Sequence, residues 1–100
     1  MSAGCAPQPP EDTERLMDLV ESRIALPSGA RPLREYFRYY FREGDKVLGH
    51  LVSQGTPGRR WIRSRDEAPE PVVDPGCSRI FVQFDTGSGR VETVSCGGVA

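Results

Sequence analysis

Cys77 and Cys96 are the residues of this 100-residue chain whose type and spacing point most directly to chemistry, namely disulfide formation. They bracket two runs rich in β-branched residues, 79–85 and 90–95, which a Gly-bearing turn separates as in a β-hairpin. Both cysteines then lie at the open end of the hairpin, where a disulfide can join its strands. Closing this loop would stabilise a small domain by roughly 3 kcal/mol. The alternative is a pair of reduced, half-buried thiols.

The predicted register of the hairpin starts from a turn that pairs Asp85 with Arg90. Directly opposite residues share a face of the sheet, so each further pair follows from the first. The expected pairs are Phe84 with Val91, Val82 with Thr93, and Arg79 with Cys96. Cys77 then lies one diagonal step from Cys96, and a slip by one residue would put the two cysteines on opposite faces.

The third cysteine, Cys5, ends the segment Ser2-Ala3-Gly4-Cys5, which resembles the processing site of bacterial lipoproteins. In that family the cysteine becomes the lipidated first residue, and the Pro-rich stretch 6–10 suits the tether that follows it. The resemblance covers four residues and lacks the leucine expected three positions before the cysteine. It implies membrane contact through a lipid at Cys5 and an oxidising compartment, in which the other two cysteines would be joined.

The segment Phe84-Asp85-Thr86-Gly87-Ser88 is identical to the active-site signature of aspartic proteases. That resemblance implies a dimeric enzyme in which each subunit supplies one Asp for general acid–base activation of water. In the family much of the fold follows the motif, whereas 12 residues follow Ser88 here. We therefore interpret Asp85 as a hairpin-turn residue, with the protease as a remote alternative.

Arginine and aromatic residues alternate along 33–42, a segment that fits both a helical and a strand period, and its aromatic content favours a strand. We expect its Arg-bearing side to face outward and to form a protein- or ligand-binding surface, because exposed Tyr, Trp and Arg dominate interfaces. Trp61 suits either the core or the rim of such a groove. The candidate binding residues are Arg34, Tyr36, Arg38, Tyr40 and Trp61. The alternative is a stacking surface for single-stranded nucleic acid, which the acidic flanking segments disfavour.

His50 is the only histidine, so the sequence holds no multi-histidine metal site. Zinc sites usually pair cysteines at short spacing, and no such pair occurs. A Gly-rich phosphate loop between a strand and a helix is also missing from the sequence. We interpret His50 as an ordinary strand residue and expect no metal, no cofactor and no catalytic residue.

One helix and about five strands must position these residues. Helical spacing of apolar residues after an acidic first turn predicts a helix of about 14 residues before the Leu26-Pro27 stop. Strands are expected over 33–42, 47–52, 60–63, 79–85 and 90–95, with a loop over 68–76. The prediction is an α+β fold in which one helix packs on a single antiparallel meander sheet of four to five strands. Its outline resembles that of cystatins.

The composition, with 37% hydrophobic residues, allows one domain, which we expect over 11–100, after a disordered Pro-rich tail over 1–10. The net charge of −1 gives no general attraction to polyanions. We expect a non-enzymatic domain that binds a protein or small ligand in the bacterial cell envelope, either periplasmic or tethered through Cys5. A cytosolic nucleic-acid-binding or regulatory protein is the alternative.

Overall fold

The computed structural model describes residues 10–69 and 77–96. Its elements, in chain order, are helix α1 (Pro10–Arg23), 3-10 helix η2 (Leu33–Glu35), β1 (Phe37–Glu43), β2 (Lys46–Val52), β3 (Gly58–Trp61), 3-10 helix η3 (Arg65–Glu67), β4 (Arg79–Asp85) and β5 (Arg90–Cys96). The predicted tail over 1–10 and most of the predicted loop over 68–76 lie outside the described residues. Within the described part of the chain, no helix is both long and apolar enough to cross a membrane.

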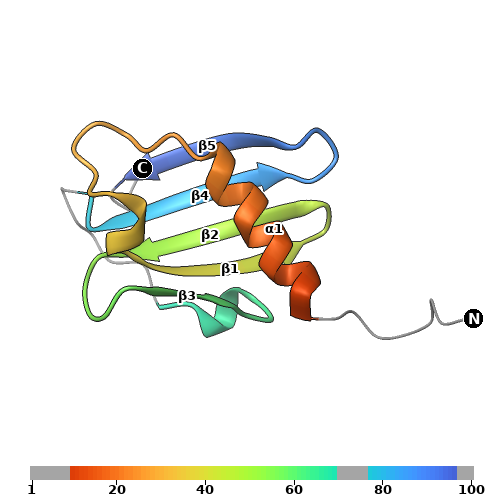
Figure 1. The fold of residues 1–100 in the computed structure, drawn as a ribbon, viewed down its shortest axis with the longest axis horizontal. Helices are drawn as coiled ribbons and strands as arrows, with labels where there is room; N and C mark the ends of the chain where they lie inside the picture. Colours follow the sequence, from red (N-terminus) through yellow and green to blue (C-terminus); the bar gives the residue numbers. More distant parts are fainter. Residues whose placement is uncertain (1–9, 70–76, 97–100) are drawn as a thin grey trace, which may run out of the picture.

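The α+β class is confirmed, but the predicted antiparallel meander is wrong, because the five strands have the order β3-β1-β2-β4-β5 (Figure 1). β3 runs parallel to β1, whereas the other three pairs are antiparallel. The end of β2 lies beside the beginning of β1, since Val52 pairs with Phe37. Residues 53–57 carry the chain past that end to the other side of β1, so β3 must run in the direction of β1.

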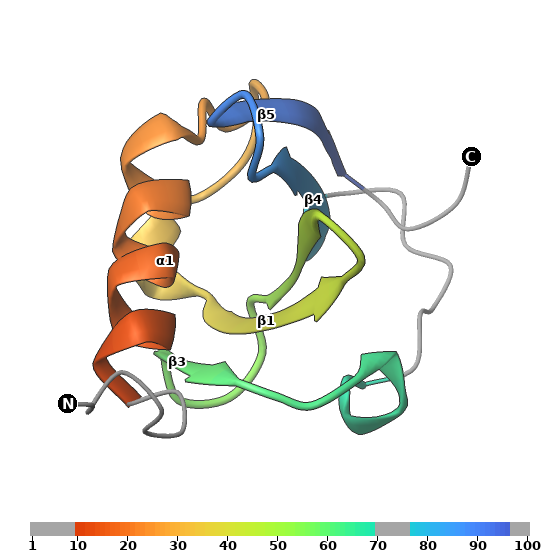
Figure 2. The same cartoon turned by 90° about the vertical axis from the view of Figure 1, so that its right-hand side faces the viewer.

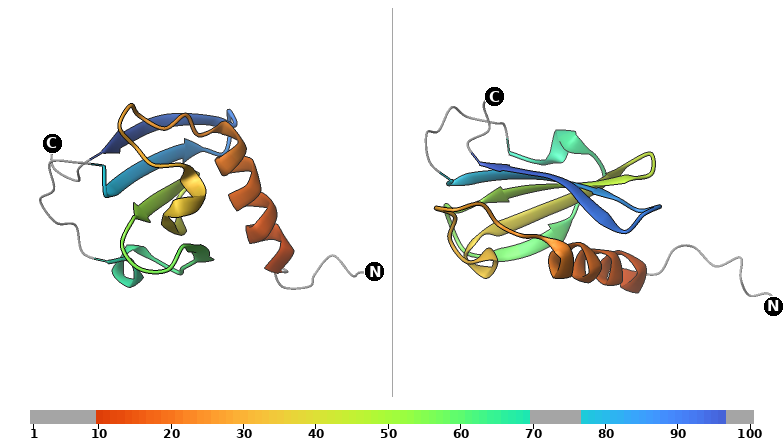
Figure 3. Two further views of the ribbon diagram at one scale, coloured as in Figure 1. Left: turned by 60° about the vertical axis from the view of Figure 1, so that its left-hand side comes forward. Right: turned by 90° about the horizontal axis from the view of Figure 1, so that it is seen from above.

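Helix α1 covers one face of the sheet, and η3 lies on the opposite side (Figures 2 and 3). The amphipathic pattern of α1 is confirmed, because Met17 and Val20 are buried against the sheet. The core between helix and sheet consists of Met17, Val20, Tyr36, Tyr40, Val47, Leu51, Ile80, Val82 and Phe84. Among residues 10–69 and 77–96, no helix of this length lies on the opposite face, which we call the open face.

Two glycines allow the tight connections between antiparallel strands. Gly44 has a φ of 62°, which suits the first central position of the β1–β2 turn. Gly89 has a φ of 72° and ends the turn between β4 and β5, where its amide donates to the Asp85 carbonyl at 2.8 Å. The two turns lie side by side, because the Thr86 amide and hydroxyl both donate to the Asp45 carbonyl.

The terminal hairpin and the Cys77–Cys96 disulfide are confirmed, with a Cα–Cα distance of 4.7 Å between the cysteines. The register near the turn is also as predicted, because Asp85 pairs with Arg90 and Phe84 with Val91. The remaining predicted pairs are wrong. Val82 lies opposite Val94, and Ile80 lies opposite Cys96, because a bulge shifts the register between Gln83 and Phe84.

Candidate functional site

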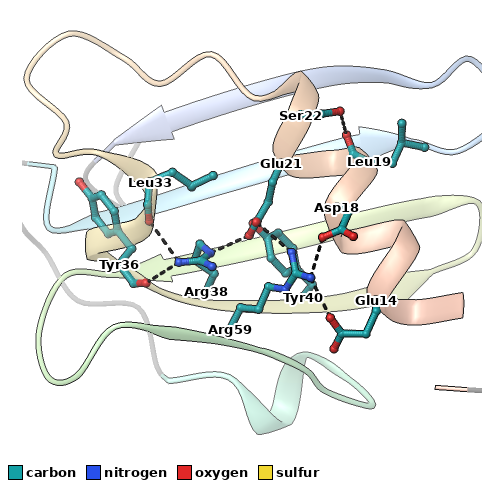
Figure 4. Close-up of polar contacts among 10 residues, drawn as sticks. All are labelled: Glu14, Asp18, Leu19, Glu21, Ser22, Leu33, Tyr36, Arg38, Tyr40 and Arg59. Carbon is teal, nitrogen blue, oxygen red and sulfur yellow. Dashed lines mark hydrogen bonds and ion pairs between the residues drawn. The ribbon is translucent and has the colours of Figure 1, made fainter. Parts of the chain in front are cut away.

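The Arg-bearing side of β1 faces α1 and is engaged in an ion-pair cluster (Figure 4). The Glu21 carboxylate accepts hydrogen bonds from Arg38 Nε at 2.6 Å and from the Tyr40 hydroxyl at 2.8 Å. Its other oxygen accepts one from Arg59 Nη1 at 3.0 Å. Arg59 on β3 also contacts two further carboxylates of α1, those of Glu14 and Asp18, each at 2.7 Å. Carboxylates thus satisfy the guanidinium groups of Arg38 and Arg59 inside the molecule.

The prediction that this side forms an exposed binding surface is therefore wrong. Tyr36 and Tyr40 are 0% exposed, and Trp61 packs half-buried against the core. The Tyr36 hydroxyl donates to the Cys77 carbonyl at 2.5 Å, so it links the start of β1 to the disulfide. Arg34, on η2, is the only exposed member of the five predicted residues. The physical reason is that α1 packs on the side that the sequence pattern assigned to solvent.

The open face carries the other residues of the same alternation. Cross-strand pairing places one row of side chains over four strands, consisting of Phe41, Leu48, Gln83 and Thr93. The next row on the same face consists of Tyr39, His50, Phe81 and Ser95. A cavity of about 470 Å³ lies over these rows. Its volume falls within the range of roughly 300–1,000 Å³ that is typical of small-molecule sites.

Described residues of the β3–β4 connection form another wall of this cavity. Arg65 and Asp66 of η3 line it together with Ala68 and Pro69. The Arg65 guanidinium lies 5.7 Å from the centre of the Phe41 ring, in a cation–π arrangement. It also forms an ion pair of 2.9 Å with Glu43 at the end of β1. These contacts hold η3 over the open face, where it turns a sheet surface into a cavity.

His50 lines the cavity and is the polar residue of most chemical interest there. It is 5% exposed, and its ring lies 4.5 Å from that of Phe81. Burial, and then the positive charge of Arg79, lower the pKa of His50 to about 4, so the imidazole is neutral at neutral pH. Among the described residues, no group forms a hydrogen bond with its buried Nε2. A buried unpaired nitrogen costs about 1–3 kcal/mol of stability.

Sequence reasoning predicted an ordinary strand histidine and missed this site. The signal for it was present, because both sides of the 33–42 alternation carry aromatic residues while the chain offers one helix to cover them. A sheet with two apolar faces must cover the second one by other means. Here the cover that the described residues provide is partial and leaves a cavity.

Asp85 of the protease-like motif lies at the tip of the terminal hairpin. Its Oδ2 accepts the Ser88 amide at 2.8 Å, and its Oδ1 accepts Lys46 Nζ at 3.0 Å. Hydrogen bonds from Ser88, followed by the one from Lys46, lower the pKa of Asp85 to about 2. Lys46 also pairs with Glu92 at 2.8 Å. These contacts give the motif a structural role in the turn, as the hairpin interpretation expects.

The lining of the cavity is partly apolar and partly polar. It combines the apolar surfaces of Phe41, Leu48 and Phe81 with a neutral imidazole, the Gln83 amide and the Thr93 hydroxyl. Within residues 10–69 and 77–96, no three metal-ligating side chains come together. A site of Cys77, Cys96 and His50 is ruled out in this state, because the two sulfur atoms are bonded to each other.

Comparison with known proteins gives no relative from which a role can be carried over. No protein-family model, curated protein or solved structure matches this chain. Because one fold can serve many functions, the argument for function rests on the site itself.

Proposed function

We propose that this protein is a non-enzymatic ligand-binding module of the bacterial cell envelope and that its ligand occupies the cavity on the open face. The observation that carries the proposal is a cavity of about 470 Å³ whose wall includes the aromatic residues Phe41 and Phe81 and the largely buried His50. Apolar cavities with few polar groups are typical of small-molecule sites. The partner in this proposal is therefore a small ligand rather than a protein.

The disulfide supports the envelope location. A Cys77–Cys96 bond is compatible with an oxidising compartment outside the cytosol, where such bonds persist. In the proposal the module is periplasmic or tethered to a membrane through a lipid at Cys5, a residue that lies outside the described part of the chain.

The engagement of the arginines also favours a small ligand over nucleic acid. Binding of a phosphate backbone needs guanidinium groups that are free to contact it. Arg38 and Arg59 are held by carboxylates of α1, and Arg63 and Arg65 pair with Glu67 and Glu43.

The test compares the small molecules that co-purify with two tryptophan variants. Leu48→Trp fills the cavity from its floor, whereas Leu19→Trp makes the same change at an α1 residue that is 37% exposed and remote from the cavity. Each protein is captured from its native cells and then denatured, and the released compounds are identified by mass spectrometry. Thermal unfolding checks that both variants are folded.

The proposal predicts a compound that is enriched with the wild-type protein and with Leu19→Trp and is lost from Leu48→Trp. Equal recovery from all three proteins would place binding outside the cavity. Recovery of no compound from the wild-type protein would equally contradict a ligand-binding role.

A further inference from the structure

The charged residues in the described lining of the open-face cavity indicate the chemistry of its ligand, and this inference rests on the proposed function. They are Arg65 and Asp66, which are neighbours in η3 and have opposite signs. The Arg65 guanidinium is engaged, because its Nε and Nη2 donate to the two carboxylate oxygens of Glu43 at 3.1 and 2.9 Å. Asp66, by contrast, has no ion pair among residues 10–69 and 77–96. The lining therefore offers a carboxylate that no described side chain pairs with.

The charges next to Asp66 along the chain do not cancel its own. Arg63 and Glu67 pair with each other at 3.0 Å, just as Arg65 pairs with Glu43 at 2.9 Å. Asp66 is thus flanked by two neutral pairs and keeps its negative charge. Opposite charges attract at short distance and like charges repel. A cation is therefore favoured beside Asp66, and a carboxylate or phosphate group is disfavoured there.

Arg60 and Arg79 lie on the open face but outside the described lining. Arg60 is exposed on the edge strand β3, where water and salt screen its charge. Arg79 lies four residues before Gln83 on β4, and Gln83 belongs to the row of Phe41, over which η3 is held. Four strand residues span about 13 Å. A group that contacts Asp66 is therefore much closer to that carboxylate than to the strand position of Arg79.

The apolar part of the lining suits an aromatic body. Phe41, Leu48 and Phe81 come from the neighbouring strands β1, β2 and β4 and all line the cavity. Aromatic rings pair favourably with other rings in offset or edge-to-face arrangements. His50 lies beside Phe81 and is neutral at pH 7, because burial lowers its pKa to about 4. This side chain therefore does not repel a cationic ligand.

We propose that the cavity binds an arylalkylamine, that is, a small molecule whose protonated amino group pairs with Asp66 while its ring lies against Phe41 and Phe81. Asp66 selects the charge of the ligand, and the two phenylalanines bind its apolar part. Asp66 is a binding residue in this proposal and takes no part in any reaction.

The test uses 2-phenylethylamine and 2-phenylethanol, two probes of similar shape of which only the amine is charged at pH 7. Dissociation constants for both are measured from methyl NMR shifts of Leu48 and Thr93, which line the cavity. The measurement is repeated on Asp66→Asn, which removes the charge and keeps the shape. The matched control is Asp45→Asn, the same change at an exposed turn residue outside the described lining. Both positions are exposed, so both variants are expected to fold, and thermal unfolding checks this.

The quantity of interest is the ratio of the two affinities, because comparing it between variants cancels the unequal hydration of the probes. We expect Asp66→Asn to shift this ratio by about 5-fold toward the alcohol, as the loss of one partly solvated ion pair implies, and Asp45→Asn to leave it nearly unchanged. In 1 M NaCl the preference of the wild-type protein for the amine should weaken.

Two results would overturn the selection of an amine and leave the binding role intact. One is an unchanged ratio in Asp66→Asn with both probes still shifting the cavity methyl groups, and the other is an equal shift of the ratio in Asp45→Asn. Failure of both probes to shift the methyl groups of Leu48 and Thr93 in the wild-type protein would contradict the binding site itself.

Discussion

The Tyr40 hydroxyl donates a hydrogen bond of 2.8 Å to Oε2 of Glu21, which joins the interior strand β1 to helix α1. Burial, and then the neighbouring negative charge of Glu21, raise the pKa of Tyr40, so the phenol stays protonated and remains a donor. The contact belongs to the ion-pair cluster beneath the helix, where the side chains of Arg38 and Glu21 are only 13% and 16% exposed. This face of the sheet is structural, and in our proposal the ligand binds on the open face.

Glu21→Gln should lower the free energy of unfolding by about 2 kcal/mol, because three donors would lose a charged acceptor. For a chain of this length, that corresponds to a fall in Tm of about 10 °C. Thermal unfolding followed by circular dichroism measures the change. The matched control is Glu35→Gln, because the Arg31–Glu35 pair is 3.7 Å long and its side chains are 66% and 50% exposed. The control should cost less than about 0.5 kcal/mol. Equal effects of the two substitutions would show that the cluster does not stabilise the fold.

Tyr40→Ser should destabilise the protein by about 3–5 kcal/mol, because a fully buried ring is replaced by a cavity. Tyr40→Phe keeps the ring and removes only the hydroxyl, so it should cost about 1 kcal/mol. Urea unfolding of both variants separates the packing of the ring from its hydrogen bond. A Tyr40→Ser protein as stable as the wild type would restore the exposed binding surface that the sequence suggested.

The assignment of the two sides of β1 marks how far the sequence could predict this fold. The alternation itself was readable, as were α1, the β1–β2 turn and the Cys-bearing hairpin. The side that faces the core could not be predicted, because arginines are normally solvated and the prediction therefore placed the Arg-bearing side in solvent. The carboxylates of Glu14, Asp18 and Glu21 share one face of α1. They form ion pairs with the arginines, which can therefore lie beneath the helix rather than in solvent. Ion pairs between the acidic residues of the helix and the arginines of the strand could therefore have been considered from the sequence.

Long-range pairing was the other part that local patterns could not give. A bulge in the terminal hairpin moves Cys96 opposite Ile80, and no residue type in the sequence predicts this bulge. The parallel placement of β3 likewise depends on the path of residues 53–57 around the start of β1. The disulfide could be predicted despite the wrong register, because both cysteines remain at the same end of the hairpin.

The Cys77→Ser, Cys96→Ser double variant should lose about 3 kcal/mol of stability, because the disulfide closes a loop between residues 19 positions apart. The expected fall in Tm is about 15 °C. Reductant should lower the Tm of the wild-type protein to a similar value and leave the double variant unchanged. Cys5→Ser, the same change at the third cysteine, should keep both the Tm and its sensitivity to reductant. If reductant does not change the Tm of the wild-type protein, the disulfide does not stabilise the fold.

His50 should make stability depend on pH between about 7 and 5. Its pKa is about 4 in the folded protein and about 6.5 in the unfolded chain, so the unfolded chain binds the proton first as pH falls. Stability is therefore close to full above about pH 7 and should decrease by about 2 kcal/mol by pH 5. Urea unfolding at each pH measures this change.

His50→Leu is the control for this dependence. The variant has no histidine, so its free energy of unfolding should change little with pH over the same interval. The carboxylates with lowered pKa values, such as Glu43 and Glu92, act only below about pH 4.5 and do not interfere. An equal loss of stability in the variant would show that His50 is not the titrating group.

The most direct test of the open-face cavity as the binding site is a crystal structure of the protein grown with p-bromophenol. Bromine gives an anomalous signal that locates the ring without reference to the protein model. We predict a bromine peak inside the cavity beside Phe41 and Phe81. An empty cavity, or bromine found only against α1 near Leu19, would contradict it.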